Sequence, residues 1–185
     1  MILPIYAYGQ PVLKKVAKPI DKDYPELQNL LANMWETMYN AEGIGLAAPQ
    51  IGLSIRIFMM DTAQLKDEDG TIQGFKQAFI NAEKIEETGE VKDYEEGCLS
   101  IPDLRGDVKR PGVLTLRYLD ENFEEHTKTF TGLNARVIQH EYDHIDGKLF
   151  TEKLKPIKKR MMKRKLEIIR KGLVQVDYKM KFVRS

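Results

Sequence analysis

The sequence of 185 residues is poor in two residue types that carry much protein chemistry, since it has one cysteine, Cys98, and three histidines. A single cysteine excludes an internal disulfide and fits a reducing compartment. No apolar run approaches the roughly 20 residues that a membrane-spanning helix needs. The N-terminus lacks the basic and long apolar regions of a secretory signal. These absences predict a cytoplasmic protein without a disulfide framework or a membrane anchor.

The composition is that of a globular protein, with 42% hydrophobic and 31% charged residues. The length and the lack of any internal repeat or linker predict a single domain over residues 1–185. The net charge of +1 hides an asymmetry. Residues 153–185 carry 13 Lys/Arg against 2 acids, whereas residues 1–152 carry 16 Lys/Arg against 26 acids. This basic end predicts either a solvated amphipathic helix or a surface that faces a polyanion such as RNA.

Apolar residues at helical spacing predict one helix near each end of the chain. The first runs from about residue 24 to 41, with an Asp-x-x-Glu start signal at Asp23 and Glu26. The second is strongly basic, runs from about residue 156 to 171, and is ended by Gly172. Both are expected to place an apolar stripe against the core.

Alternating apolar and polar residues predict several strands. These cover residues 54–60, 77–81, 84–94, 103–109, 113–119, 123–131 and 174–183. A turn is expected near Gly89, and a second turn at residues 120–122 joins two of the strands into an antiparallel hairpin. The polar stretch over residues 61–76 predicts an exposed loop.

A third helix is predicted from about residue 133 to 145, with Thr131 at its start and Gly147 after its end. It carries His140 and His144. Positions i and i+4 share one helical face, so both imidazoles can reach a single metal ion. The predicted fold class is therefore α+β: antiparallel β-sheets surround a central metal-binding helix, with an N-terminal helix and a basic C-terminal helix followed by a strand.

A metal with two histidine ligands needs at least one more donor. Cys98 lies in a glycine-containing turn, and we expect Cys98, His140 and His144 to bind one metal with a position open for water. Glu141 directly follows the first histidine, where it can take a proton from that water and pass it to a leaving amine. The amide of Gln50 and a backbone N–H of the Cys98 turn can stabilise an oxyanion. This set suits hydrolysis of an amide or ester.

Structural interpretations of the same residues stay open. Histidines also cap helices and pack in cores, and an unpaired cysteine is commonly a small buried residue. The glycine-rich segment 43–52 is either a turn between a helix and a strand or a backbone edge that a substrate approaches closely. The third histidine, His126, is interpreted as an exposed strand residue rather than a fourth ligand.

Three segments together resemble the signature motifs of the bacterial peptide deformylases. Residues 43–50 read GIGLAAPQ, residues 96–100 read EGCLS and residues 139–144 read QHEYDH. They occur in the order of that family with similar separations, and the resemblance covers roughly residues 1–170. It implies a hydrolase that removes the formyl group from the N-terminal formylmethionine of nascent bacterial polypeptides and releases formate.

The resemblance also implies roles for individual residues. The metal ligands would be Cys98, His140 and His144. Glu141 would be the general base and acid for a metal-bound hydroxide, and Gln50 with the N–H of Leu99 would hold the formyl oxygen. Gly45 would hydrogen-bond the substrate backbone. Glu42 and Arg110 resemble an ion pair that braces the site.

The metal ion implied by the resemblance is Fe²⁺, although the ligand set alone suggests zinc. Zn²⁺, Ni²⁺ or Co²⁺ can replace iron in purified protein. The implied partners are nascent N-formylmethionyl polypeptides, with a possible ribosome contact through the basic C-terminal segment.

A methionine side chain needs an apolar pocket beside the metal. Helix geometry assigns to it Leu133, Val137 and the aliphatic stem of Arg136. Tyr94, from the strand before the cysteine, and Ile44, from the glycine-rich segment, complete the expected wall.

Two alternative functions are considered. One is another metal-dependent hydrolase that uses the same helix motif, such as a peptidase. The other is a non-enzymatic RNA- or ribosome-binding domain with a structural metal, which the basic C-terminal segment alone supports. Replacing Glu141 with alanine would abolish turnover in the enzyme and leave the binding domain unaffected.

Overall fold

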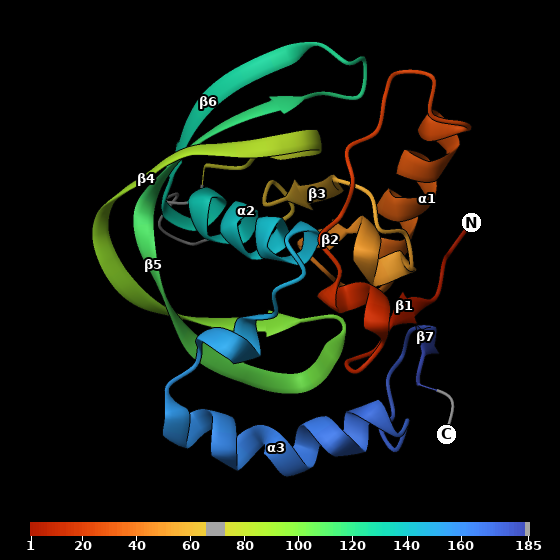
Figure 1. Cartoon of the computed structure of the whole chain (residues 1–185), viewed down its shortest axis with the longest axis vertical. Helices are drawn as coiled ribbons and strands as arrows, with labels where there is room; N and C mark the ends of the chain where they lie inside the picture. The colour runs from red at the N-terminus through yellow and green to blue at the C-terminus, as the bar shows by residue number, and fades with distance from the viewer. Residues whose placement is uncertain (66–72, 184–185) are drawn as a thin grey trace.

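The computed structural model describes residues 1–65 and 73–183 (Figure 1). In chain order, the helices and strands of this part of the chain are β1 (Ile5–Tyr6), α1 (Leu27–Asn40), β2 (Gly45–Ala47), β3 (Ile57–Asp61), β4 (Lys76–Cys98), β5 (Ile101–Leu119), β6 (Glu125–Thr131), α2 (Gly132–Ile145), α3 (Pro156–Arg170) and β7 (Met180–Lys181). Short 3₁₀ helices occur at Pro11–Lys14, Ala48–Ile51 and Phe150–Lys153. The predicted α+β class is confirmed.

An antiparallel sheet in the order β2-β3-β4-β5-β6 forms the frame of the molecule. Its two long strands, β4 and β5, curve around α2 (Figure 1). The predicted hairpin is present, because β5 pairs with β6 from Val113 opposite Thr131 to Leu119 opposite Glu125. Inward-facing residues of β5 alternate with exposed ones, as expected for a strand with one face on the core.

The prediction of separate short strands within β4 and within β5 is wrong. Each is continuous, and the turn expected near Gly89 is a local irregularity inside β4. Gly89 has a φ of +83°, and the pairing register shifts between Thr88 and Val91. A β-bulge of this kind increases the bend of a strand without ending it. The bulge therefore helps β4 to curve around the helix.

Helix α2 occupies the concave side of this curved sheet, and its apolar residues are the centre of one core cluster. Ile138 and Ile145 are fully buried there. Gly147, which follows the helix with a φ of +69°, ends it as predicted. Thr131 is the N-cap residue but makes no side-chain capping hydrogen bond. The fixed position of α2 determines where its two histidines point.

Helix α1 starts later than its sequence signal predicts. Glu26, expected inside the first turn, is instead the N-cap residue in the left-handed region, and no side chain caps the helix. Met34 and Met38 are fully buried in a second core cluster, which secures the helix by packing. Tertiary packing, rather than the Asp-x-x-Glu pattern, therefore sets this boundary.

The C-terminal region follows the prediction as far as Gly172. Helix α3 is confirmed, but the strand expected over residues 174–183 is reduced to β7, which pairs in parallel with β1. Exposed and half-buried residues do alternate through 173–180. The alternation that the sequence shows is therefore real. Most of the segment nevertheless has no partner strand in the described part of the chain, so it does not form a strand.

The expected exposed loop over residues 61–76 begins inside the protein. Asp61 ends β3 and Thr62 follows it, and both are buried. The acidic part of that loop lies outside the described residues. Among the described helices, all are too short or too polar to cross a membrane.

Candidate metal centre and active site

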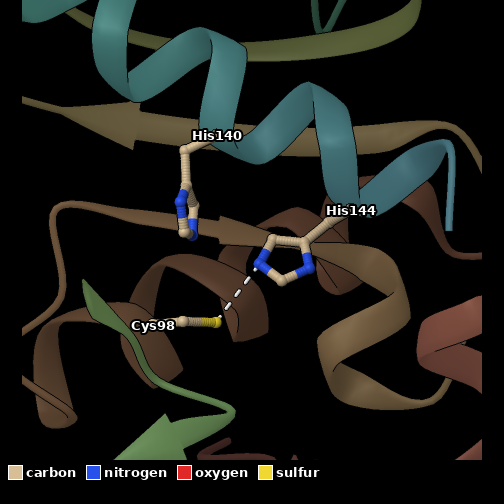
Figure 2. Close-up of side chains that lie close together, drawn as sticks. All are labelled: Cys98, His140 and His144. Atoms are coloured by element: carbon tan, nitrogen blue, oxygen red, sulfur yellow. Dashed lines mark hydrogen bonds between the residues drawn. The ribbon is translucent and has the colours of Figure 1, made fainter. Parts of the chain in front are cut away.

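The end of β4 and one face of α2 bring Cys98, His140 and His144 together (Figure 2). One ligand atom from each residue lies within 4.8 Å of the other two. Cys98 Sγ is 3.3 Å from His144 Nε2. The two imidazole rings are 5.0 Å apart between centroids and nearly perpendicular. The structure therefore assembles the three residues that the sequence predicts as ligands.

A buried ion network holds this cluster from behind. Glu96 Oε2 is 2.9 Å from His140 Nδ1. Arg110 donates to both oxygens of Glu96, at 2.6 and 2.9 Å, and to Asp143 Oδ2 at 2.8 Å. The hydrogen bond at Nδ1 leaves Nε2 as the His140 atom on which a bound ion would replace the proton, which is the usual arrangement at metal-binding histidines.

Burial and pairing shift the ionisation of this network. Burial favours the neutral form of Glu96, but hydrogen bonds from Arg110 and His140 outweigh it and lower the pKa of Glu96 to about 2. Burial also opposes the charge of His140, yet its contacts with Cys98 and Glu96 raise its pKa well above the ordinary value. The pKa of His144 is lowered, mainly by burial and to a smaller extent by the charge of His140. His144 is therefore neutral, the form in which imidazole binds metals.

Glu141 is 4% exposed and lies beside the cluster in the same groove. Burial is the main cause that raises its pKa to about 7. Its Oε2 atom is buried and has no hydrogen-bond partner among the described residues. A carboxylate that is half protonated near neutral pH and is not committed to another protein group can both take and give a proton.

Gly45, on β2, is positioned against the same carboxylate. A Cβ atom at this position would lie 2.4 Å from Glu141 Oε1, so no other residue fits without displacing the carboxylate. The glycine-rich segment is thus more than a turn between a helix and a strand, because it supplies β2 and the 3₁₀ helix that follows. β2 is also one of the two edge strands of this sheet in the described part of the chain.

Gln50 is 2% exposed, and its side chain is fixed at both ends. Its Oε1 accepts a hydrogen bond from the Ala47 N–H at 2.9 Å. Its Nε2 lies 3.5 Å from Cys98 Sγ and donates to Ser100 Oγ at 3.2 Å. The amide N–H₂ group of Gln50 is therefore held at the edge of the metal cluster.

A groove of about 800 Å³ opens above the cluster. All of the residues predicted to contact substrate line it: Ile44, Gly45, Tyr94, Leu133, Arg136 and Val137. Gln50, Leu99 and Glu141 line it as well. The guanidinium of Arg136 donates to the carbonyls of Val108 and Lys92, which leaves its stem as the apolar part available in the groove.

The predicted pair between Glu42 and Arg110 is not formed. Glu42 is exposed, and Arg110 binds Glu96 and Asp143 instead. The sequence contains a signal for this, because the inward positions of β5 are even-numbered and Arg110 falls among them. A buried cation requires buried acids, and both of its partners belong to the motif segments.

His126 lies outside the site, as predicted. It is half-buried in β6 rather than exposed, and its Nε2 is 2.8 Å from Asp120 Oδ2.

The donor set fits a divalent metal ion. A thiolate and two imidazoles are the ligands that zinc, iron and related ions share, and three protein ligands leave room for a reacting group. Glu141, whose Oε2 has no hydrogen-bond partner in the described part of the chain, lines the same groove as Cys98 and His140. These features, at the floor of a groove, are those expected of a metal-dependent hydrolase.

Comparison with known proteins gives the family. The family model described as "Polypeptide deformylase" matches residues 2–160, and the chain belongs to this family. The chain is 57% identical to the peptide deformylase of Christiangramia forsetii, with 98% of this chain and 96% of the relative covered. It is 53% identical to that of Flavobacterium psychrophilum, with 99% and 98% covered.

Solved structures show the same fold. The crystal structure of a peptide deformylase from Legionella pneumophila matches with a TM-score of 0.79 at 37% identity, covering 94% of this chain and 98% of that one. A crystal structure of peptide deformylase from Plasmodium falciparum matches with a TM-score of 0.81 at 31% identity, covering 91% and 95%. Membership of the family makes the chain an enzyme.

Proposed function

We propose that this protein hydrolyses the N-formyl group of formylmethionine at the start of nascent bacterial polypeptides and releases formate. The observation that carries the proposal is the position of Glu141, buried and without a partner among the described residues, beside the cluster of Cys98, His140 and His144. Relatives of nearly equal length that are named peptide deformylase support the same activity.

Cys98 Sγ, His140 Nε2 and a nitrogen of His144 would hold one divalent ion. When bound, such an ion polarises a carbonyl and lowers the pKa of a coordinated water towards ~7. We propose Fe²⁺ as its identity in the cell, on the basis of the family resemblance. Zn²⁺, Ni²⁺ or Co²⁺ would occupy the same donors in purified protein.

Glu141 is proposed as general base and then general acid. It takes a proton from the attacking water as the new C–O bond forms at the formyl carbon. It then delivers that proton to the methionine nitrogen as the C–N bond breaks, which yields formate and a free amine. The pKa of about 7 that burial produces suits both steps at neutral pH.

Gln50 and Leu99 are proposed to stabilise the negative charge that develops on the formyl oxygen. The Gln50 amide is held beside Cys98 by the Ala47 N–H and Ser100 Oγ, so it is oriented before substrate arrives. In the described part of the chain, the N–H of Leu99 donates no hydrogen bond. Donors fixed in advance need no reorganisation during the reaction.

The methionine side chain is proposed to lie against Leu133, Val137 and the stem of Arg136, with Ile44 and Tyr94 at the groove wall. Gly45 would hydrogen-bond the substrate backbone through β2, because an edge strand presents unpaired peptide groups.

The decisive experiment compares formyl-Met-Ala-Ser with unblocked Met-Ala-Ser under anaerobic conditions, after loading the protein with Fe²⁺. We expect stoichiometric formate from the first peptide and no cleavage of the second. Equal cleavage of internal bonds in both peptides would instead identify a peptidase and overturn the proposal.

Ribosome contact and a cytoplasmic location are also proposed. Helix α3 exposes a row of cations: Lys158, Lys159, Arg160, Lys163, Arg164 and Lys165. This surface favours an RNA-rich partner near which formylated chains emerge.

A further inference from the structure

The segment after α3 returns to the active-site groove. Gly172, with a φ of +72°, ends the helix, and the Leu173 N–H bonds the Ile168 carbonyl while the Gly172 N–H bonds that of Ile169. This pair of bonds is the Schellman arrangement that reverses the chain. Gln175, Val176, Asp177 and Tyr178 then line the same groove as Cys98 and Glu141. These residues lie beyond the part of the chain that the family model matches.

The segment is fastened at its far end rather than free. Its strand β7 pairs with β1, and the Ile5 N–H donates to the Lys179 carbonyl at 2.8 Å. Gln10 Nε2 donates to the Phe182 carbonyl at 2.7 Å. Met180 and Phe182 pack against a buried apolar cluster. Residues 175–178 are therefore part of a fixed wall.

Tyr178 connects this wall to the turn between β4 and β5. Its hydroxyl donates to the carbonyl oxygen of Leu99 at 2.8 Å. Burial raises the pKa of Tyr178, so the hydroxyl remains a neutral donor at any pH at which the protein works. The side chain is half-buried, and its ring packs against partly and fully buried apolar residues.

The turn itself contains only Leu99 and Ser100, because Cys98 is opposite Ile101. Both of its carbonyls are held from outside the hairpin. The Tyr8 N–H donates to the Ser100 carbonyl at 2.8 Å, and Tyr178 holds that of Leu99. The Leu99 carbonyl shares a rigid peptide plane with the Ser100 N–H, and the Leu99 N–H shares one with the carbonyl of Cys98, the last residue of β4. Because the first plane is held by Tyr178 and the second by the strand, the two backbone torsions of Leu99 between them are restricted, and with them the direction of its N–H.

We propose that Tyr178 is a positioning residue that holds the Leu99 turn so that the Leu99 N–H points at the reacting oxygen. This inference rests on the proposed function, in which that N–H stabilises the oxyanion. The hydrogen bond of the Tyr178 hydroxyl goes to the Leu99 carbonyl rather than to a predicted metal ligand or to Glu141. The alternative is that its hydroxyl bonds Leu99 only because a half-buried donor needs a partner.

The test compares Tyr178→Phe, which removes only the hydroxyl, with Tyr6→Phe. Tyr6 is a matched control, because its hydroxyl also bonds the C-terminal segment, through Lys181 Nζ at 2.9 Å, but not the Leu99 turn. Removing an oxyanion donor entirely lowers kcat by ~10²–10³-fold. A donor that is present but loosely held should lose only part of its effect on the rate. We therefore expect kcat to fall about 5- to 20-fold in Tyr178→Phe.

KM for formyl-Met-Ala-Ser should stay within about twofold of wild type, because a contact made in the transition state affects kcat rather than ground-state binding. Metal content and thermal unfolding midpoint should equal those of Tyr6→Phe. Amide hydrogen exchange of the peptide that spans residues 96–101 should be faster in Tyr178→Phe only. An unchanged kcat, or a rise in KM alone, would overturn the proposal.

The exchange measurement separates this inference from the proposed function. If wild-type protein releases no formate, the proposed function fails, and the exchange rates alone decide whether Tyr178 holds the turn. Equal exchange in the two variants would show that it does not.

Discussion

The acid–base properties of Glu141 are determined by the residues around it rather than by its position next to His140 in the sequence. Burial raises its pKa, and Gly45 leaves just enough space for its carboxylate. Replacing it with glutamine keeps the size and removes the base. We expect Glu141→Gln to lower kcat by at least ~10²–10⁴-fold, the range for a general base. Metal content should be unchanged, as measured by atomic emission. Turnover close to that of wild type would exclude Glu141 as the base.

Cys98 contributes the one soft donor of the cluster. A serine at this position offers a neutral hydroxyl, which is a much weaker ligand for Fe²⁺ or Zn²⁺ than a thiolate. We expect Cys98→Ser to contain far less than one metal ion per chain after anaerobic purification, with its fold retained by circular dichroism. One tightly bound ion per chain in this variant would contradict the three-ligand assignment.

The placement of the candidate site residues was largely predictable because spacing within one element is a local property. His140 and His144 share a helix, and the helix turn places Val137 and Leu133 on the same face. The partners of Arg110 were not predictable in the same way. Its pairing with Glu96 and Asp143 joins three elements, and such contacts depend on the register of β4 against β5.

At the scale of elements, the buried ion pairs of Arg110 with Glu96 and Asp143 connect β5 to β4 and to α2. The pKa of Glu96, about 2, lies below its ordinary value of 4.5. Stability from its ionised form is therefore complete above about pH 4.5 and is lost as pH falls towards 2. A shift of this size corresponds to ~3 kcal/mol at neutral pH.

Glu96→Gln should lower the free energy of unfolding at pH 7, since it leaves Arg110 less well paired. The difference in free energy of unfolding between this variant and wild type should become smaller as pH falls from 4.5 to 2. Urea unfolding in the presence of a chelator would measure this without a contribution from metal release. Glu95→Gln is the control, because its exposed pair with Arg105 is worth only ~0–1 kcal/mol. A gap that stays constant down to pH 2 would show that Glu96 is not the titrating group.

Element types were easier to predict than element boundaries. The patterns in residues 77–94 and 103–119 gave strands, but a bulge at Gly89 and a half-buried proline and glycine at 111–112 looked like strand ends from sequence alone. Only the partner strand shows that pairing continues through them. The reverse occurred at residues 174–183, where alternation was present and a partner strand was mostly absent.

At the scale of the whole molecule, charge is divided between a basic C-terminal part and an acidic remainder. Lys159 and Lys163 lie on one exposed face of α3. We expect Lys159→Glu with Lys163→Glu to weaken co-sedimentation with ribosomes, and wild-type binding to fall steeply with added salt, since phosphate contacts release counterions.

The control for this experiment is the pair Lys18→Glu with Lys22→Glu, which makes the same charge change at two exposed lysines of the segment before α1. Formate release from a short peptide should be the same in both double variants and in wild type. Equal ribosome binding by the two variants would assign the contact, if any, to another surface.

The pairing of β1 with β7 links residue 5 to residue 180. Synthesis proceeds from the N-terminus at a few residues per second, so β1 emerges long before its partner exists. Contacts so distant along the chain are also the slowest to form. The wall that carries Tyr178 can therefore form only after residue 180 has emerged, so an enzyme proposed to act on unfinished polypeptides gains this wall later than the segments that carry Cys98, His140 and His144.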